Sequence, residues 1–115
     1  MRLLRASLLA AALCAACLEF WTACNQGSGA SANPKAQAGR GLYLANCIAC
    51  HNTNPALDGT LGPALKGSSL ELVQARVLRG EYPIGYTPKR KTAVMVKLPL
   101  SEENVEAIQA YLSLP

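Results

Sequence analysis

The feature that most constrains this chain is Cys47-Ile48-Ala49-Cys50-His51, where two thiols stand one helical turn apart and the only histidine follows directly. Such a cluster has several uses. A thioredoxin-like redox pair needs a βαβ unit, which the sequence pattern lacks. Zinc needs four ligands, and the cluster offers three with no further Cys or His in the folded part. A purely structural disulfide gives no role to the adjacent histidine.

The use that remains is covalent haem attachment. Cys47 and Cys50 are predicted to form thioethers with the two haem vinyl groups, and His51 is predicted to bind the iron. One motif and one histidine predict one haem c. The thin core favours the same conclusion, because after residue 34 the aromatic residues are four tyrosines, with no Phe and no Trp. A domain this small and poor in large side chains needs a cofactor to fill its centre.

The beginning of the chain predicts an export signal over residues 1–23. Arg2 and Arg5 precede an apolar run over residues 6–18. That run is too short to cross a bilayer as a stable helix, and it is apolar on every face, which argues against a buried core helix. We therefore expect an exported protein, either in the periplasm or anchored to a membrane and facing the periplasm.

The end of the signal has alternatives that the cysteines help to rank, because an exported protein avoids stray thiols. Cleavage before Cys24 would make that residue a lipid-bearing N-terminus, so a lipid anchor through Cys24 is one leading alternative. Cleavage after residues 30–32 would remove all three early cysteines. Cleavage before Cys17 would leave Cys24 free and ranks last. Residues 24–34 are small, polar and uncharged, which predicts a flexible tether.

The folded part is predicted to be all-α and to span residues 35–115. Apolar residues at helical spacing predict three helices, over residues 35–46, 69–79 and 102–112. Gly80 can end the second helix and Ser101 can cap the third. No segment alternates well enough to predict a strand. Two long loops, residues 52–66 and 81–98, are expected to wrap a ligand.

The whole folded part resembles the small monohaem cytochromes c of class I. The residues that carry the resemblance, besides the cysteine motif, are Gly39, Tyr43, Gly62-Pro63-Ala64-Leu65, Ile108 and Tyr111. It implies the cytochrome c fold, three main helices and long loops around one covalent haem, with the first helix crossing the last at Gly39 and Tyr43. It also implies that the Pro63 carbonyl accepts a hydrogen bond from the other ring N–H of His51 and orients that ring.

The resemblance further implies that Met95 is the second axial ligand of the haem iron. Met95 is the only methionine besides Met1, and it lies in the loop before the last helix. The local pattern departs from the family, where proline often follows this methionine directly, whereas here the order is Met95-Val96-Lys97-Leu98-Pro99. Lys91 and Lys97 are rival donors, although a lysine must lose its proton first. A lone methionine is otherwise a core filler.

These features predict a one-electron carrier between redox enzymes outside the cytoplasm. A His/Met pair raises the reduction potential and leaves no open iron position, so we expect no enzyme activity. One alternative is a haem-bearing electron-transfer subunit of a dehydrogenase complex. A less favoured alternative is a haem-based gas sensor with a displaceable Met95.

The charge pattern bears on partners. The whole chain has a formal charge of +4, and without the signal it keeps nine Lys and Arg against six Asp and Glu. The basic residues gather near Met95, namely Arg76, Arg79, Lys89, Arg90, Lys91 and Lys97. They favour a redox partner with an acidic docking patch. Alternatively, some of them, or Tyr82 and Tyr86, hold the haem propionates. No nucleic-acid partner is expected.

Overall fold

The computed structural model describes residues 33–115. The predicted export signal over residues 1–23, Cys24, and most of the predicted tether lie outside the described residues. The order of elements is α2 (Pro34–Asn46), α3 (Leu70–Gln74), η2 (Ala75–Arg79) and α4 (Glu102–Leu112). No strand occurs among residues 33–115, which confirms the predicted all-α class. None of the helices in this part of the chain is long and apolar enough to cross a membrane.

Helix α2 begins at Pro34, one residue inside the segment predicted as a tether. The reason is local. The Asn33 side chain accepts hydrogen bonds from the backbone N–H groups of Lys35 and Ala36, at 3.1 and 3.3 Å. Pro34 needs no hydrogen-bond partner for its nitrogen, and its fixed φ suits the first turn of a helix.

The second predicted helix, over residues 69–79, is helical throughout but changes its winding. Ser69 caps it, because its hydroxyl accepts a hydrogen bond from the Leu72 N–H at 3.2 Å. The first half, α3, is an ordinary helix, whereas the second half, η2, is a π-helical turn. Gly80 ends it with φ 75°, a left-handed conformation that glycine adopts without strain. The π-helical turn was not predicted, since residues that repeat at helical spacing do not distinguish the two windings.

Helix α4 has the predicted cap. The Ser101 hydroxyl accepts a hydrogen bond from the Asn104 N–H at 3.1 Å, and the Asn104 side chain accepts one from the Ser101 N–H at 3.3 Å. Glu102 and Glu103 lie in the first turn, where the helix dipole favours negative charge. The helix then buries Val105, Ile108 and Leu112, as its apolar spacing predicts.

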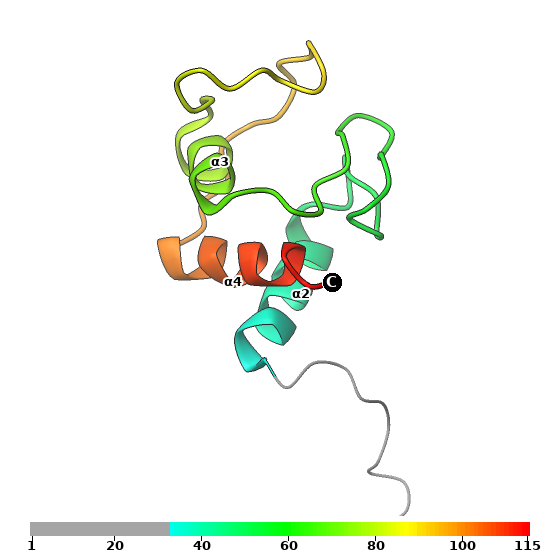
Figure 1. Ribbon diagram of the computed structural model, residues 1–115, viewed down its shortest axis with the longest axis vertical. Helices are drawn as coiled ribbons and strands as arrows, with labels where there is room; N and C mark the ends of the chain where they lie inside the picture. Colours follow the sequence, from blue (N-terminus) through cyan, green and yellow to red (C-terminus); the bar gives the residue numbers. More distant parts are fainter. Residues whose placement is uncertain (1–32) are drawn as a thin grey trace, which may run out of the picture. The chain divides into compact units, whose positions relative to one another are not determined.

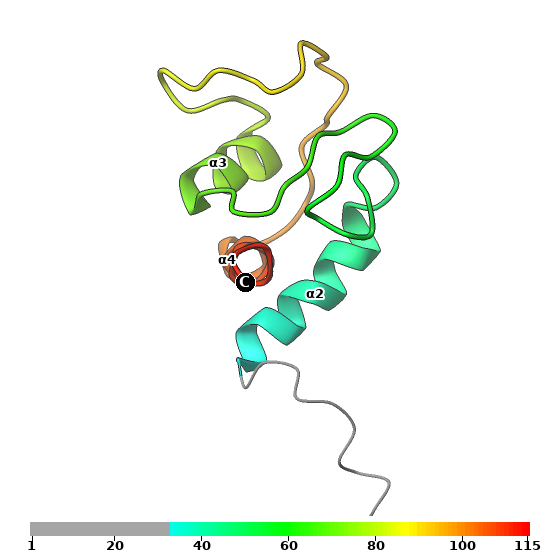
Figure 2. The ribbon, with the colours of Figure 1, turned by 45° about the vertical axis from the view of Figure 1, so that its right-hand side comes forward.

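Helices α2 and α4 cross, and they make the most extensive contact between elements in the described part of the chain (Figures 1 and 2). Gly39 lies at the crossing, where a side-chain carbon would collide with the Ala107 carbonyl. One turn later the Tyr43 and Tyr111 rings meet at 5.5 Å between centroids. The predicted crossing at Gly39 and Tyr43 is therefore present, although the backbone nearest to Gly39 belongs to Ala107, which the sequence did not single out.

The core lies on one side of this crossing. Helix α3 packs on α4, and the buried valines of α3 and η2 join the crossing residues in one cluster. The buried members are Tyr43, Val73, Val77, Val105, Ile108 and Leu112. Tyr43 is the one aromatic residue among them, so the core of residues 33–115 is small, and the two long loops lie beyond it.

Candidate functional site

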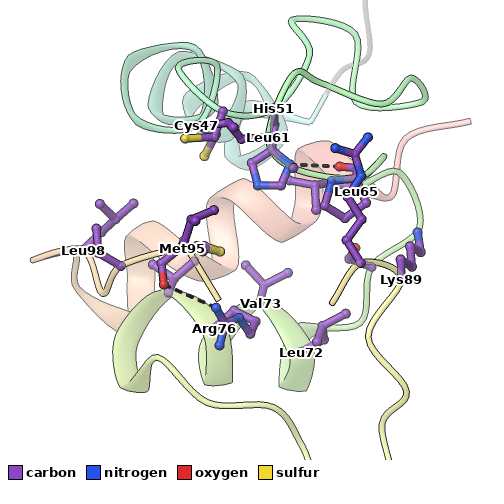
Figure 3. A pocket seen from close by; sticks show the side chains of 18 of the residues that line it. Cys47, His51, Leu61, Leu65, Leu72, Val73, Arg76, Lys89, Met95 and Leu98 are labelled. Carbon is purple, nitrogen blue, oxygen red and sulfur yellow. Dashed lines mark hydrogen bonds between the residues drawn. The ribbon is translucent and has the colours of Figure 1, made fainter. Parts of the chain in front are cut away.

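A cavity opens between the end of α2, α3 with η2, and the two long loops. Its volume is about 190 Å³, more than ten times what a single buried water needs. Apolar side chains form most of its wall, together with Cys47, Cys50, His51, Pro63 and Met95. Figure 3 shows His51 and Met95 on different sides of this cavity. The fold thus brings all five of the predicted site residues to one place.

The turn that carries the two cysteines follows α2 directly and keeps helix-like hydrogen bonds. The His51 N–H donates to the Cys47 carbonyl at 2.9 Å, as in a helix, and the Cys47 N–H donates to the Tyr43 carbonyl at the same distance. The Tyr43 hydroxyl donates to the Asn52 carbonyl at 2.6 Å. Burial raises the pKa of the Tyr43 phenol to about 12, so this hydroxyl stays a donor at neutral pH. Hydrogen bonds to Tyr43 therefore join Cys47, at the start of the motif, and Asn52, just after it, to the crossing of α2 and α4.

The His51 ring has a defined orientation. His51 is 9% exposed, and its Nδ1 lies 2.8 Å from the Pro63 carbonyl oxygen. A carbonyl can only accept, so Nδ1 carries the proton and donates. In the neutral imidazole the other ring nitrogen, Nε2, then has a free lone pair. An imidazole fixed in this way is ready to bind a metal through Nε2, and the hydrogen bond strengthens it as a donor.

Two glycines allow the ring to sit where it does. A side-chain carbon at Gly62 would collide with the His51 ring, and one at Gly59 would collide with the backbone of Cys50 and His51. The Gly59 N–H donates to the Gly62 carbonyl at 2.9 Å, which closes the loop over the ring. Position 62 thus requires glycine because a side chain there would collide with the His51 ring, while the Pro63 carbonyl accepts the hydrogen bond from that ring.

Both thiols are free. Cys47 and Cys50 are half-buried and are not joined in a disulfide. Burial raises the pKa of the Cys47 thiol to about 11, so it is protonated at neutral pH rather than a thiolate. Within residues 33–115 no group of three or more His, Cys, Asp or Glu side chains is placed to hold a metal ion. The arrangement suits covalent attachment of an organic group better than a zinc site.

Met95 is the predicted second ligand, and it lines the cavity. It is half-buried and packs against the core cluster. The rival donors Lys91 and Lys97 are exposed and do not line the cavity. Of these three candidates, Met95 alone therefore lines the same cavity as His51, and Figure 3 shows both of these side chains there.

The two long loops are tied together by side chains that lie over this cavity. Lys89 donates to the Ala64 carbonyl at 2.9 Å, and Arg90 donates to the Gly59 carbonyl at 3.2 Å. Arg90 also pairs with Asp58 at 3.4 Å. The Ala64 N–H donates to Asp58 at 2.7 Å. This hydrogen bond and the nearby Arg90 hold the pKa of the Asp58 carboxyl below its usual value.

Arg76, Tyr82 and Tyr86 form a stack on the cavity wall. The Tyr82 and Tyr86 rings are nearly parallel, with centroids 5.5 Å apart, and the Arg76 guanidinium carbon lies 4.3 Å from the Tyr82 centroid. Arg76 also donates to the Gly80 carbonyl at 2.8 Å and to the Met95 carbonyl at 3.4 Å. Sequence reasoning placed these residues near the haem but missed that they contact one another, because Tyr82 and Tyr86 lie in a loop, where residue spacing does not determine which side chains meet.

An all-α domain with a Cys-x-x-Cys-His turn, an oriented histidine and an apolar cavity defines the class of c-type haem proteins. The sequence model of the cytochrome c family matches residues 36–114. The chain belongs to the cytochrome c family. Among curated proteins no match was found, and among solved structures none was found either.

The family implies haem c, held covalently, and makes this a haem electron-transfer protein. The residues present fit that group. Two unpaired thiols stand one helical turn apart at the edge of a largely apolar cavity, and an imidazole with a free Nε2 lone pair lines the same space. The family and the three helices confirm the class I cytochrome c fold expected from the sequence.

Proposed function

We propose that this chain is an exported one-electron carrier in which Cys47 and Cys50 hold the haem and His51 and Met95 are the axial ligands. The observation that carries the proposal is the 2.8 Å hydrogen bond from His51 Nδ1–H to the Pro63 carbonyl, because it leaves Nε2 free toward the cavity that Met95 also lines. Bound haem supplies an iron that alternates between the ferric and ferrous states.

The residues of the chain then set how that iron behaves. Thioethers from Cys47 and Cys50 make loss of the cofactor impossible without bond cleavage. His51, tightened by Pro63, is a strong donor, and a thioether sulfur from Met95 favours reduced iron. Two protein ligands leave no position for oxygen or substrate, which suits transfer of an electron without other chemistry.

Carbon monoxide distinguishes this function from gas sensing. The ferrous wild-type protein is expected to bind the gas poorly, and Met95→Ala is expected to bind it readily and to have a lower reduction potential while keeping its haem. Lys97→Ala is the matched control, because Lys97 does not line the cavity. Rapid binding of carbon monoxide by the wild-type protein would refute six-coordinate iron.

The charge distribution supports a partner with an acidic docking patch. Residues 50–100 carry seven Lys and Arg against three Asp and Glu, whereas residues 101–115 carry three Glu and no basic residue. The basic part includes the loops over the cavity. The acidic residues lie on α4, below α3 in Figure 1, and none of them lines the cavity. Such a field steers an acidic partner toward the cavity side.

Small redox reagents of opposite charge can test this field. Reduction by the hexacyanoferrate(II) anion is expected to slow as salt is added, and reduction by the hexaammineruthenium(II) cation to speed up. Lys91→Gln is expected to weaken both salt effects. Lys35→Gln is the control, because Lys35 lies on α2 and pairs with Glu106 of α4 at 2.6 Å. Equal salt effects on both reagents would argue against a steering field.

The predicted export signal supports an exported location, and so does the family, whose members are typically exported. We place the protein in the periplasm, either free or held by a lipid on Cys24 with the following polar residues as a tether. Labelling cells with radioactive palmitate would separate the two cases. Label in the wild-type chain that is lost in Cys24→Ala supports the anchor, and an unlabelled, soluble wild-type chain argues against it.

A further inference from the structure

We infer that Arg76 is a positioning residue that fastens the Met95 segment to η2 and so keeps the methionine sulfur at the cavity. The inference rests on the proposed ligation by Met95. It assigns to Arg76 a role distinct from steering a partner, because the bonds that matter point inward, to the backbone of residues 80 and 95.

The Met95 segment has little else to hold it. In the described structure, residues 91–97 make no backbone–backbone hydrogen bond, and the first one comes at the Leu98 N–H, which donates to the Val77 carbonyl at 2.8 Å. Val94 and Val96 on either side of Met95 are 57% and 69% exposed. The proline that often follows this methionine in the family is absent here, so the chain lacks that local restraint as well.

Arg76 provides a hydrogen bond to the backbone of Met95 itself. Its guanidinium donates to the Met95 carbonyl at 3.4 Å and to the Gly80 carbonyl at 2.8 Å. Figure 3 shows the bond from Arg76 to Met95 at the lower edge of the cavity. Together with the Val77–Leu98 hydrogen bond, it ties both ends of the segment 95–98 to the same π-helical turn.

The Arg76 guanidinium is oriented by contacts other than its hydrogen bond to Met95. Its face lies 4.3 Å from the centroid of Tyr82, and Tyr82 is stacked on Tyr86. A planar cation stacked on an aromatic ring and bonded to Gly80 has few orientations left, so little entropy is lost when it also bonds Met95. The stack and the two hydrogen bonds therefore act as one unit that keeps the segment closed.

Closure of the segment has a measurable equilibrium consequence. An external ligand binds the iron only when Met95 has moved away, so its apparent dissociation constant depends on the fraction of open molecules. Losing one charged hydrogen bond and one cation–π contact is expected to raise that fraction about five- to tenfold. The apparent dissociation constant for the ligand falls by the same factor.

The test uses the ferric holoprotein and imidazole as the probe, with loss of the weak far-red absorption band of methionine-ligated haem as the signal. Arg76→Gln is expected to lower the apparent dissociation constant about five- to tenfold. Tyr82→Leu keeps the Arg76 hydrogen bonds but removes the ring on which the guanidinium and Tyr86 stack, and it is expected to lower the apparent dissociation constant about two- to threefold. The second variant keeps the test decisive if Arg76→Gln fails to accumulate.

Arg79→Gln is the matched control. Arg79 lies on the same π-helical turn, pairs with Glu81 at 2.7 Å and does not line the cavity. Its imidazole affinity is expected to equal that of the wild type. A wild-type dissociation constant in the Arg76 or Tyr82 variant, or an equal change in the Arg79 variant, would overturn the inference. A wild-type protein without the far-red band would instead show that Met95 is not the ligand, which overturns the proposed ligation along with it.

Discussion

A pair of glycines in α2 offers a sharp test of how the helix crossing supports the site. Gly39 and Gly41 lie two residues apart in the same helix. A side-chain carbon at Gly39 would collide with the Ala107 carbonyl and would lie 2.9 Å from the Ile108 nitrogen, whereas one at Gly41 would meet nothing within 4 Å. Alanine at either position adds the same methyl group, so the difference between the two variants isolates the crossing.

The magnitudes follow from these surroundings. Gly41→Ala gains helix propensity and is expected to stabilise the protein by about 0.5–1 kcal/mol. Gly39→Ala gains the same amount, but it must push two backbones apart, because a carbonyl and an amide cannot rotate away as a flexible side chain can. Overpacking costs about 3 kcal/mol at such a rigid site, which leaves a net loss of about 2 kcal/mol.

Thermal unfolding of the holoprotein, followed by circular dichroism, measures both effects. In a domain of this size 1 kcal/mol corresponds to about 4–8 °C. Gly39→Ala is therefore expected to lower Tm by about 10 °C, and Gly41→Ala to raise it by about 5 °C. If Gly39→Ala stabilises the protein as much as Gly41→Ala does, the close crossing of α2 and α4 is wrong.

Three further predictions concern the site. Gly62→Ala is expected to displace the His51 ring, weaken its hydrogen bond and destabilise the holoprotein by about 2 kcal/mol in denaturant unfolding; an unchanged midpoint would contradict the packing of the ring. Asp58→Asn is expected to lower Tm at neutral pH. A carboxyl whose pKa is lowered in the folded protein stabilises that fold at pH values above its ordinary pKa of 3.8. The Tm difference from wild type should disappear once the pH falls below the lowered pKa of Asp58 in the folded protein, where the wild-type carboxyl is protonated as well. A Tm difference that persists in acid would contradict this role of Asp58. Cys47→Ala is expected to keep haem on a denaturing gel through Cys50, and the double alanine variant is expected to lose it.

The parts of the fold that local chemistry determines were predictable. Ser101 begins α4 through hydrogen bonds with a near neighbour, and Gly80 ends η2 through its own backbone angles, and both roles are confirmed by the structure. The presence of a covalent haem was also predictable, because the five consecutive residues from Cys47 to His51 form its attachment motif. Pro63 was placed beside His51 by family resemblance, and the 2.8 Å contact agrees with that placement. The assignment of Met95 as a ligand remains a prediction.

What could not be predicted depends on contacts between distant positions. Ala107 is the backbone neighbour of Gly39, yet an alanine on a helix carries no sign of a close crossing. The π-helical turn at residues 75–79 has the same apolar spacing as an ordinary helix. The contact between Arg76 and Met95 joins residues 19 positions apart, so the sequence suggested only a partner-facing, solvated or propionate-binding arginine.

The most direct test of the proposed function is the far-red absorption spectrum of the ferric wild-type protein, recorded beside those of Met95→Ala and Lys97→Ala. We predict the weak band of methionine-ligated haem in the wild type and in Lys97→Ala, and its absence in Met95→Ala. A wild-type spectrum without the band, or a band that survives in Met95→Ala, would contradict the claim that His51 and Met95 together close the iron for electron transfer.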